Sequence, residues 1–134
     1  MVLTFSYIKE ESDLFGLIYR PVALVKFLSK TNSWVQVEMV VDSGADYSLL
    51  PKYLSEDLHV NLKTDCKLIE TNGVGGSSRV YFLPKIKIKL GKWERNIPIG
   101  FVDSDDVPPL LGRHLFMETF ETNLSRNHKV SFSV

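Results

Sequence analysis

One short segment presents a carboxylate in a setting suited to acid–base chemistry. Asp42 follows the apolar run Glu38–Val41 and precedes Ser43-Gly44-Ala45. The pattern predicts a strand that delivers the carboxylate from the core to the start of a tight loop. The small residues after it let another backbone approach closely. Because Asp-Ser-Gly is also common in ordinary turns, this segment alone leaves both interpretations open.

A glycine-rich segment lies between two strand-like runs. Its sequence is Asn72-Gly73-Val74-Gly75-Gly76-Ser77-Ser78, which suits either a hairpin tip or a phosphate-binding loop. A Walker-type loop ends in Gly-Lys-Ser/Thr and opens a helix, and a dinucleotide loop also requires a helix. Here the strand-like run Arg79–Leu83 follows, which favours a β-hairpin.

A third segment combines aliphatic residues with a glycine and an arginine. Pro108 and Pro109 precede Leu110-Leu111-Gly112-Arg113. Taken alone, this pattern is typical of a strand that ends where a helix begins. Its position after the other two segments is what makes it informative.

The elements that must position these residues are predicted to be mostly strands, because apolar and polar residues alternate along the chain. The spacing is typical of an all-β barrel or sandwich. The expected strands are Val22–Phe27, Trp34–Val41, Arg79–Leu83, Lys85–Leu90, Asn96–Val102 and Lys129–Val134. Two short helices are expected as well, Pro51–Leu58 and Arg113–Thr119.

In order and spacing, these segments resemble those of the retropepsins, the retroviral-type aspartic proteases, from about Arg20 to Leu115. The matching segments are Arg20-Pro21-Val22 (first strand), Asp42–Asp46 with Ser48 (catalytic loop), Gly73–Gly76 (flap tip) and Leu110–Arg113 (aliphatic-Gly-Arg motif). The resemblance implies a closed β-barrel or sandwich with a flap hairpin. It also implies one protease domain spanning residues 1–134.

The resemblance further implies peptide hydrolysis by two facing aspartates that hold a water between them. This chain has one such loop, so the active form is expected to be a homodimer in which two copies of Asp42 share a proton. Asp42, Ser43 and Gly44 are the implied catalytic residues. Arg113 is implied to hold Asp46 beside the site, and Arg20 to reach Asp46 of the partner subunit. For Arg20, an ordinary exposed surface charge is an open alternative.

Residues implied to contact an extended peptide substrate come from three segments. They are Ala45, Asp46, Leu49, Gly73, Val74, Gly75, Pro108 and Leu110. The aliphatic members imply a preference for apolar residues around the cleaved bond. For Leu49 and Leu110, packing in the core is an equally open interpretation.

Both ends of the chain depart from compact viral members of the family. Residues 1–19 form an extension, and residues 120–134 form a longer tail that is expected to be a hairpin turning at Ser125–His128. Both ends lie where the family builds its dimer interface. The tail and the helix expected after the catalytic loop are more similar to cellular and bacterial retropepsin-like proteins.

Two other functions compete with catalysis. One is a retropepsin-like domain that dimerises or binds peptides with little or no catalysis, although every catalytic-type residue is present. The other is a nucleotide-binding β-domain, which depends on the glycine-rich segment alone and lacks the lysine-hydroxyl ending.

Composition argues against several other classes of function. Sixteen basic residues balance sixteen acidic ones, so no overall field favours nucleic acid or an anionic membrane. Cys66 is the only cysteine, and His59, His114 and His128 are scattered, which disfavours a metal site. No cofactor is expected. Because the chain lacks a signal-like start and a long apolar run, a cytoplasmic location without membrane attachment is expected. Excision of the chain from a longer precursor is an open alternative.

Overall fold

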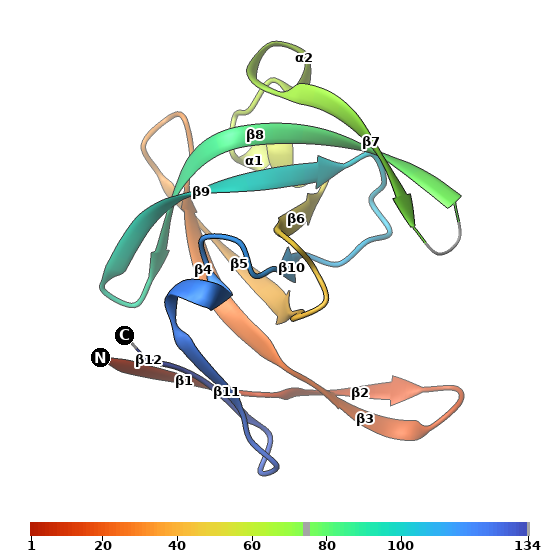
Figure 1. Ribbon diagram of the computed structural model, residues 1–134, viewed down its shortest axis with the longest axis vertical. Coiled ribbons are helices and arrows are strands. Elements are labelled where there is room, and N and C mark those ends of the chain that lie inside the picture. Colours follow the sequence, from red (N-terminus) through yellow and green to blue (C-terminus); the bar gives the residue numbers. More distant parts are fainter. Residues whose placement is uncertain (74–75, 134) are drawn as a thin grey trace.

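The computed structural model describes residues 1–73 and 76–133, with the backbone alone for 71–73 and 76–77. Within them, a seven-stranded sheet has the order β4-β5-β10-β6-β9-β8-β7. Since β4 also pairs with β8, the sheet closes into a barrel (Figure 1). Its strands are β4 (Val22–Leu28), β5 (Trp34–Val41), β6 (Ser48–Pro51), β7 (Lys67–Gly73), β8 (Gly76–Leu90), β9 (Trp93–Val102) and β10 (Leu110–Leu111). The predicted all-β, retropepsin-like fold is confirmed.

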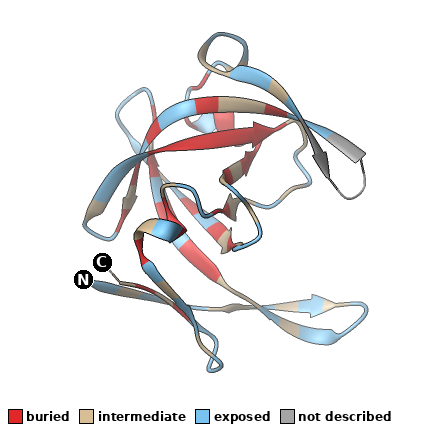
Figure 2. Ribbon diagram, viewed as in Figure 1, coloured by how far each residue is buried: buried red, intermediate tan, exposed pale blue. Residues whose placement is uncertain are grey.

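Alternation along the barrel strands determines which side chains form the core. In β4, the buried residues Val25 and Phe27 alternate with exposed Leu24 and Lys26. Figure 2 shows the buried positions concentrated in the barrel strands. Burial of these apolar side chains is the main force that closes the barrel. The largest fully buried side chains are Phe27, Met39, Leu50, Leu58, Ile88, Leu90, Ile97, Ile99, Phe101, Leu111, Phe116 and Phe132.

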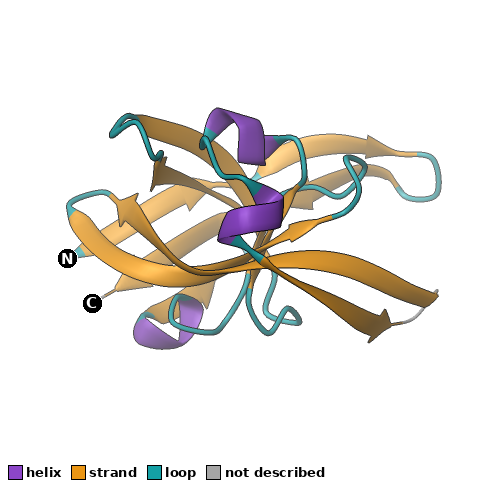
Figure 3. Cartoon of the chain, turned by 90° about the horizontal axis from the view of Figure 1, so that it is seen from above, coloured by secondary structure: helices purple, strands orange, loops and turns teal. Residues whose placement is uncertain are grey.

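The helices are short turns beside the strands, as Figure 3 shows. They are α1 (Leu54–Asp57), α2 (Leu62–Asp65) and a 3-10 turn, η1 (Met117–Thr119). Among the described residues, no helix is long and apolar enough to span a bilayer. Helix α2 was not predicted, although the Asn61 side chain caps it by accepting hydrogen bonds from the amides of Lys63 and Thr64.

The predicted helix Pro51–Leu58 begins too early. Pro51 is the last residue of β6 and pairs with Val102 of β9, because the chain is still extended along the parallel neighbour at that point. The turn at Lys52–Tyr53 precedes α1, whose first turn holds the buried Leu54. Proline at the end of a strand is as acceptable as proline at the start of a helix, and the sequence alone does not distinguish them.

The second predicted helix, Arg113–Thr119, is correct only over Met117–Thr119. The amides of Arg113 and His114 donate instead to the carbonyl oxygens of Ala45 and Asp46, at 3.0 and 2.8 Å. Leu115 has φ of 57°, in the left-handed region that interrupts a right-handed helix at a cost of about 1 kcal/mol. Contacts with a distant loop therefore replace the first turn of this helix.

Residues from both ends of the chain form a separate three-stranded sheet. Strand β12 (Lys129–Ser133) lies between β1 (Val2–Ser6) and β11 (Glu121–Leu124). The predicted C-terminal hairpin is confirmed, and the amide of His128 donates to the Ser125 carbonyl in its turn. Phe132 of β12 packs edge-on against Phe116 at 5.9 Å, which joins this sheet to the barrel core.

A hairpin arm extends from the chain between β1 and the barrel. It consists of β2 (Ile8–Ser12) and β3 (Gly16–Arg20), which pair only with each other in the described structure. All of residues 8–20 are at least partly exposed, and Figure 1 shows the arm reaching away from the barrel. The Tyr19 ring stacks on the His128 ring at 3.9 Å, which fastens the base of the arm to the C-terminal hairpin.

Candidate active site

Two parallel strands carry Asp42 to its position. Strand β10 pairs with the end of β5, with Leu110 opposite Val40 and Leu111 opposite Val41. The amide of Asp42 continues this ladder by donating to the Leu111 carbonyl at 3.0 Å. The carboxylate therefore leaves the sheet at a fixed point, directly after the buried Val41.

The loop after Asp42 is closed by its own hydrogen bonds. The amide of Gly44 donates to Oδ1 of Asp42 at 2.9 Å, and the amide of Ala45 donates to the Asp42 carbonyl at 3.2 Å. Ser43 and Gly44 are exposed and Asp42 is half-buried. One carboxylate oxygen is thus held by the loop, while the group stays accessible to water and to another molecule.

The segment Leu110–Arg113 supports the Asp42 loop through backbone and side-chain contacts. Gly112 donates through its amide to the buried Ser48 hydroxyl at 3.0 Å. A Cβ on Gly112 would lie 2.5 Å from the carbonyl carbon and oxygen of Tyr47. Since real Cβ atoms do not come that close to backbone, only glycine lets the two segments meet.

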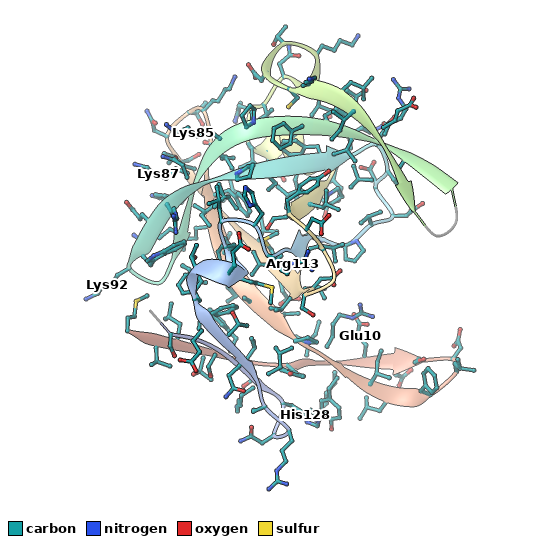
Figure 4. The ribbon with its side chains drawn as sticks, in the orientation of Figure 1. Glu10, Lys85, Lys87, Lys92, Arg113 and His128 are labelled. Carbon is teal, nitrogen blue, oxygen red and sulfur yellow. The ribbon has the colours of Figure 1, made fainter. Side chains whose placement is uncertain are left out.

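Arg113, which is labelled in Figure 4, adds side-chain contacts to the same loop. Its Nη1 donates to the Ser43 carbonyl at 2.7 Å and its Nη2 to Oδ1 of Asp46 at 2.5 Å. The expected contact between Arg113 and Asp46 is therefore present. Their side chains are 46% and 84% exposed, so the pair itself contributes modestly to stability, about 1 kcal/mol or less. Its geometric effect is to join the start and the end of the loop.

The structure also brings Leu49 and Leu110 together. They face each other across β6 and β10 and are both half-buried. Pro108 is exposed just before β10. Leu110 therefore lies on the strand next to the one that leads to Asp42, and Leu49 lies on the next strand beyond it.

The remaining predicted residues lie further out. Gly73 pairs with Gly76 at the end of the β7–β8 hairpin, whereas Val74 and Gly75 fall outside the described residues. Arg20 lies on the arm, where its Nη2 is 2.7 Å from Oε2 of Glu10. Within one chain, Arg20 thus binds Glu10, and Asp46 is held by Arg113.

A cavity of about 560 Å³ lies beside Asp46, and it was not predicted from the sequence. Its lining residues are Asp46, Tyr47, Phe82, Pro84, Pro98, Arg113, His114, Leu115 and Glu118. Burial, followed by the nearby Asp46 carboxylate, raises the pKa of the Tyr47 hydroxyl, so this group remains a neutral hydrogen-bonding partner. The lining residues come from separate segments of the chain, so no local sequence pattern indicated the cavity.

The described residues include no cluster of three or more His, Cys, Asp or Glu side chains that could hold a metal ion. The loop offers the accessible Asp42 carboxylate beside backbone amides, which suits acid–base chemistry on water.

Comparisons with known proteins agree with this geometry. A family model described as aspartyl protease matches residues 30–115, more than half of the chain. A search of curated proteins gave no match.

Two solved structures have a similar fold. A retropepsin-like aspartic protease from Rickettsia conorii has 19% sequence identity and a TM-score of 0.66, and the match covers 95% of this chain and 98% of that one. EIAV protease, complexed with the inhibitor HBY-793, has 20% identity and a TM-score of 0.55, covering 81% and 92%. With the Asp42 loop and the Leu110–Arg113 support in place, the chain belongs to the aspartyl protease family and has the retropepsin-like fold.

Proposed function

We propose that this protein is an aspartic endopeptidase that becomes active as a homodimer. The observation that carries the proposal is the Asp42 loop, which is rigidly supported by Gly112 and Arg113 yet accessible at its carboxylate. The sequence contains a single loop of this kind, and the chemistry needs two carboxylates. A second copy of the chain supplies the second one.

The proposed reaction uses the two Asp42 side chains as a pair that shares one proton. The ionised carboxylate takes a proton from the water held between them while the water oxygen attacks the scissile carbonyl carbon. The protonated carboxyl donates to the carbonyl oxygen and stabilises the tetrahedral intermediate. The carboxyl that took the proton from water then gives it to the amide nitrogen, and the C–N bond breaks to give a carboxylic acid and an amine, which returns the pair to its starting state with one shared proton. Ser43 and Gly44 position the carboxylate within each loop.

The arm supports the proposal of a dimer. Leu14 and Phe15 at its tip are 80% and 76% exposed, and an isolated two-stranded hairpin is marginally stable in water. Exposed apolar side chains grouped in this way are typical of an interaction surface. We propose that this surface contacts the partner subunit and that residues 1–19 and 120–134 form the dimer interface.

A groove of about 360 Å³ beside the arm connects the proposed dimer interface to the strands that carry the candidate active site. Its lining includes Glu10 and Arg20 of the arm, Val40 of β5 and Pro108 and Pro109 before β10. Arg20 is therefore only a short way along the surface from the strand that carries Asp42. In the proposed dimer, Arg20 contacts Asp46 of the partner subunit, which ties association of the subunits to the geometry of the site.

The substrate is proposed to bind as an extended strand across the two loops. Asp46 accepts a hydrogen bond from the substrate backbone, and Ala45, Leu49, Pro108 and Leu110 line the positions next to the cleaved bond. The hairpin that carries Gly73, Val74 and Gly75 serves as a flap that closes over the peptide and excludes water. The aliphatic residues favour apolar side chains on both sides of the bond.

The test is cleavage of denatured casein and of a peptide library from pH 4 to neutral. Asp42→Asn should abolish cleavage while leaving the thermal unfolding temperature almost unchanged, because the half-exposed side chain keeps its shape. Asp57→Asn, at an exposed position of α1, is the matched control and should cleave normally. Cleavage that survives Asp42→Asn, or a dimer that cleaves nothing at any pH, would contradict the proposal.

A further inference from the structure

The cavity beside Asp46 lies where the β8–β9 ladder is interrupted. The register of the two strands shifts between Leu83 and Ile86, opposite Ile97 and Ile99. Pro84 and Pro98 are within this interruption, and proline has no amide hydrogen to donate to a ladder. The bulge therefore brings Pro84 and Pro98 together in the lining of the cavity.

Aromatic and aliphatic groups form the walls of the cavity. The rings of Tyr47 and Phe82 meet edge to face, with centroids 6.2 Å apart at 86°. Gly100, which pairs with Phe82, makes room for the Tyr47 ring, because a Cβ there would lie 2.9 Å from Cε2 of Tyr47. Leu115, held in its left-handed conformation, contributes an aliphatic surface. The volume of about 560 Å³ is in the range of specific ligand pockets.

Charged groups surround this apolar interior unevenly. The Asp46 carboxylate is paired with Arg113 on one side. On the other side, Oε1 of Glu118 accepts a hydrogen bond from the Leu115 amide and lies 3.4 Å from Nδ1 of His114. The side chain of Glu118 is 55% exposed, so it can still bind a cation that arrives from solvent.

We propose that this cavity is a second peptide-binding pocket, which takes a large apolar side chain, above all an aromatic one, from a part of the substrate outside the residues next to the cleaved bond. A basic residue beside that side chain pairs with Glu118. The inference rests on the proposed function, because the ligand is a peptide substrate of the protease. The cavity adjoins the active site, since Asp46 and Arg113 line it and also take part in the contacts that hold the Asp42 loop. A peptide leaving the active site past Asp46 reaches this cavity directly.

Direct binding to the Asp42→Asn variant of the 134-residue chain tests the pocket without any need for catalysis. The probes are the dipeptides N-acetyl-Trp-Lys-amide, N-acetyl-Trp-Glu-amide and N-acetyl-Gly-Lys-amide, followed by amide chemical shifts in NMR. The Trp-Lys probe should perturb the amides of Phe82 and residues 113–118 and bind roughly tenfold more tightly than the Gly-Lys probe. Perturbations elsewhere, or equal affinity for the three probes, would overturn the proposal.

Two variants separate the pocket from general effects on folding. Phe82→Ala removes one wall and should abolish the preference for Trp over Gly. Because Phe82 contributes to packing, the exposed Glu118→Arg is the second variant, and it should reverse the preference for Trp-Lys over Trp-Glu. Glu121→Arg changes the charge by the same amount at an exposed position on β11. It should leave the preference for Trp-Lys over Trp-Glu unchanged. A preference that Glu118→Arg leaves intact would contradict the assigned role of Glu118.

A kinetic measurement then links the pocket to the reaction. In a series of peptides with one cleavable bond and Trp or Ala placed four to six residues away, Trp at one position should raise kcat/KM by roughly tenfold. In Phe82→Ala the Trp/Ala ratio of kcat/KM should fall towards one, and in Glu121→Arg it should stay the same. Absence of all cleavage together with normal probe binding contradicts the proposed function and not the pocket. Cleavage with a ratio near one in the unmodified protein contradicts the pocket.

Discussion

Arg113 and Asp46 are joined by a contact of 2.5 Å between Nη2 and Oδ1, while Nη1 of the same arginine binds the Ser43 carbonyl at 2.7 Å. The planar guanidinium thus spans the loop from the residue after Asp42 to its end. Since both contacts lie on the surface, their main effect is on the geometry of the loop and less on overall stability.

Replacing this fork with a single ammonium should therefore damage activity more than folding. Arg113→Lys can keep one of the two contacts and should lower kcat/KM by about tenfold, with an unfolding temperature within a few degrees of the original. Steady-state kinetics and thermal unfolding check this. Arg126→Lys, at an exposed position in the turn between β11 and β12, should change neither. Unaltered kinetics in Arg113→Lys would mean that the fork does not position the loop.

Gly112 should be one of the least replaceable residues. In Gly112→Ala the new Cβ meets the Tyr47 backbone at 2.5 Å, and neither segment can move without breaking the contacts that hold the loop. We expect a loss of about 3 kcal/mol or more in the free energy of unfolding, measured with urea. Gly16→Ala is the comparison, because Gly16 has φ of 73° and open space around it, so only about 1 kcal/mol should be lost. Equal losses would show that the close contact is unimportant.

The arm should govern association of the subunits. In the double variant Leu14→Ser, Phe15→Ser, the dimer dissociation constant measured by sedimentation should rise by about tenfold or more, because anchor side chains at an interface dominate its energy. The isolated chain should keep its far-UV circular dichroism, since the tip lies outside the core. Tyr53→Ser removes another exposed apolar side chain, 49% exposed before α1, and should leave the dimer intact. An unchanged dissociation constant in the double variant would remove the arm from the interface.

Acidic conditions should weaken one ion pair next to the barrel. A hydrogen bond from Lys30, followed by one from the Asn61 amide, lowers the pKa of the Asp65 carboxyl. Because the folded pKa is the lower one, the stabilisation is fully present above the unfolded pKa of about 4 and is lost as pH falls through the folded value. At neutral pH, the unfolding temperature of Asp65→Asn should therefore lie below that of the unmodified protein. The difference between the two unfolding temperatures should become smaller below about pH 4. The difference in unfolding temperature between Lys30→Gln and the unmodified protein should decrease in the same pH range. A difference that does not depend on pH would contradict a stabilising ion pair between Lys30 and Asp65.

Much of the fold could be predicted from local patterns. The expected strand Trp34–Val41 coincides with β5, and the turn at Ser125–His128 is where the chain reverses. Alternation works there because one face of each strand is buried. The arm was not predicted, because none of residues 8–20 is fully buried and apolar residues do not alternate regularly with polar ones there.

The candidate site could be predicted only in part. The order of the Asp42 loop, the glycine-rich hairpin and Leu110–Arg113 indicated the family, but the residues that complete the site depend on contacts between distant segments. Arg113 and His114 were expected to begin a helix because the sequence does not show that their amides bind Ala45 and Asp46. The cavity was missed for the same reason, since Tyr47, Phe82 and Glu118 meet only after the barrel has closed.

An active site shared between two chains is tested most directly by mixing. Activity is measured at a constant concentration of the unmodified chain with increasing amounts of the Asp42→Asn variant, after the two have been refolded together. If each active site needs one Asp42 from each of two chains, random pairing should reduce activity to about half in an equal mixture and to about a tenth at a ninefold excess. Activity that stays constant across the series, while an affinity-tagged Asp42→Asn variant carries the untagged unmodified chain with it in a pull-down, would contradict a site shared between two copies.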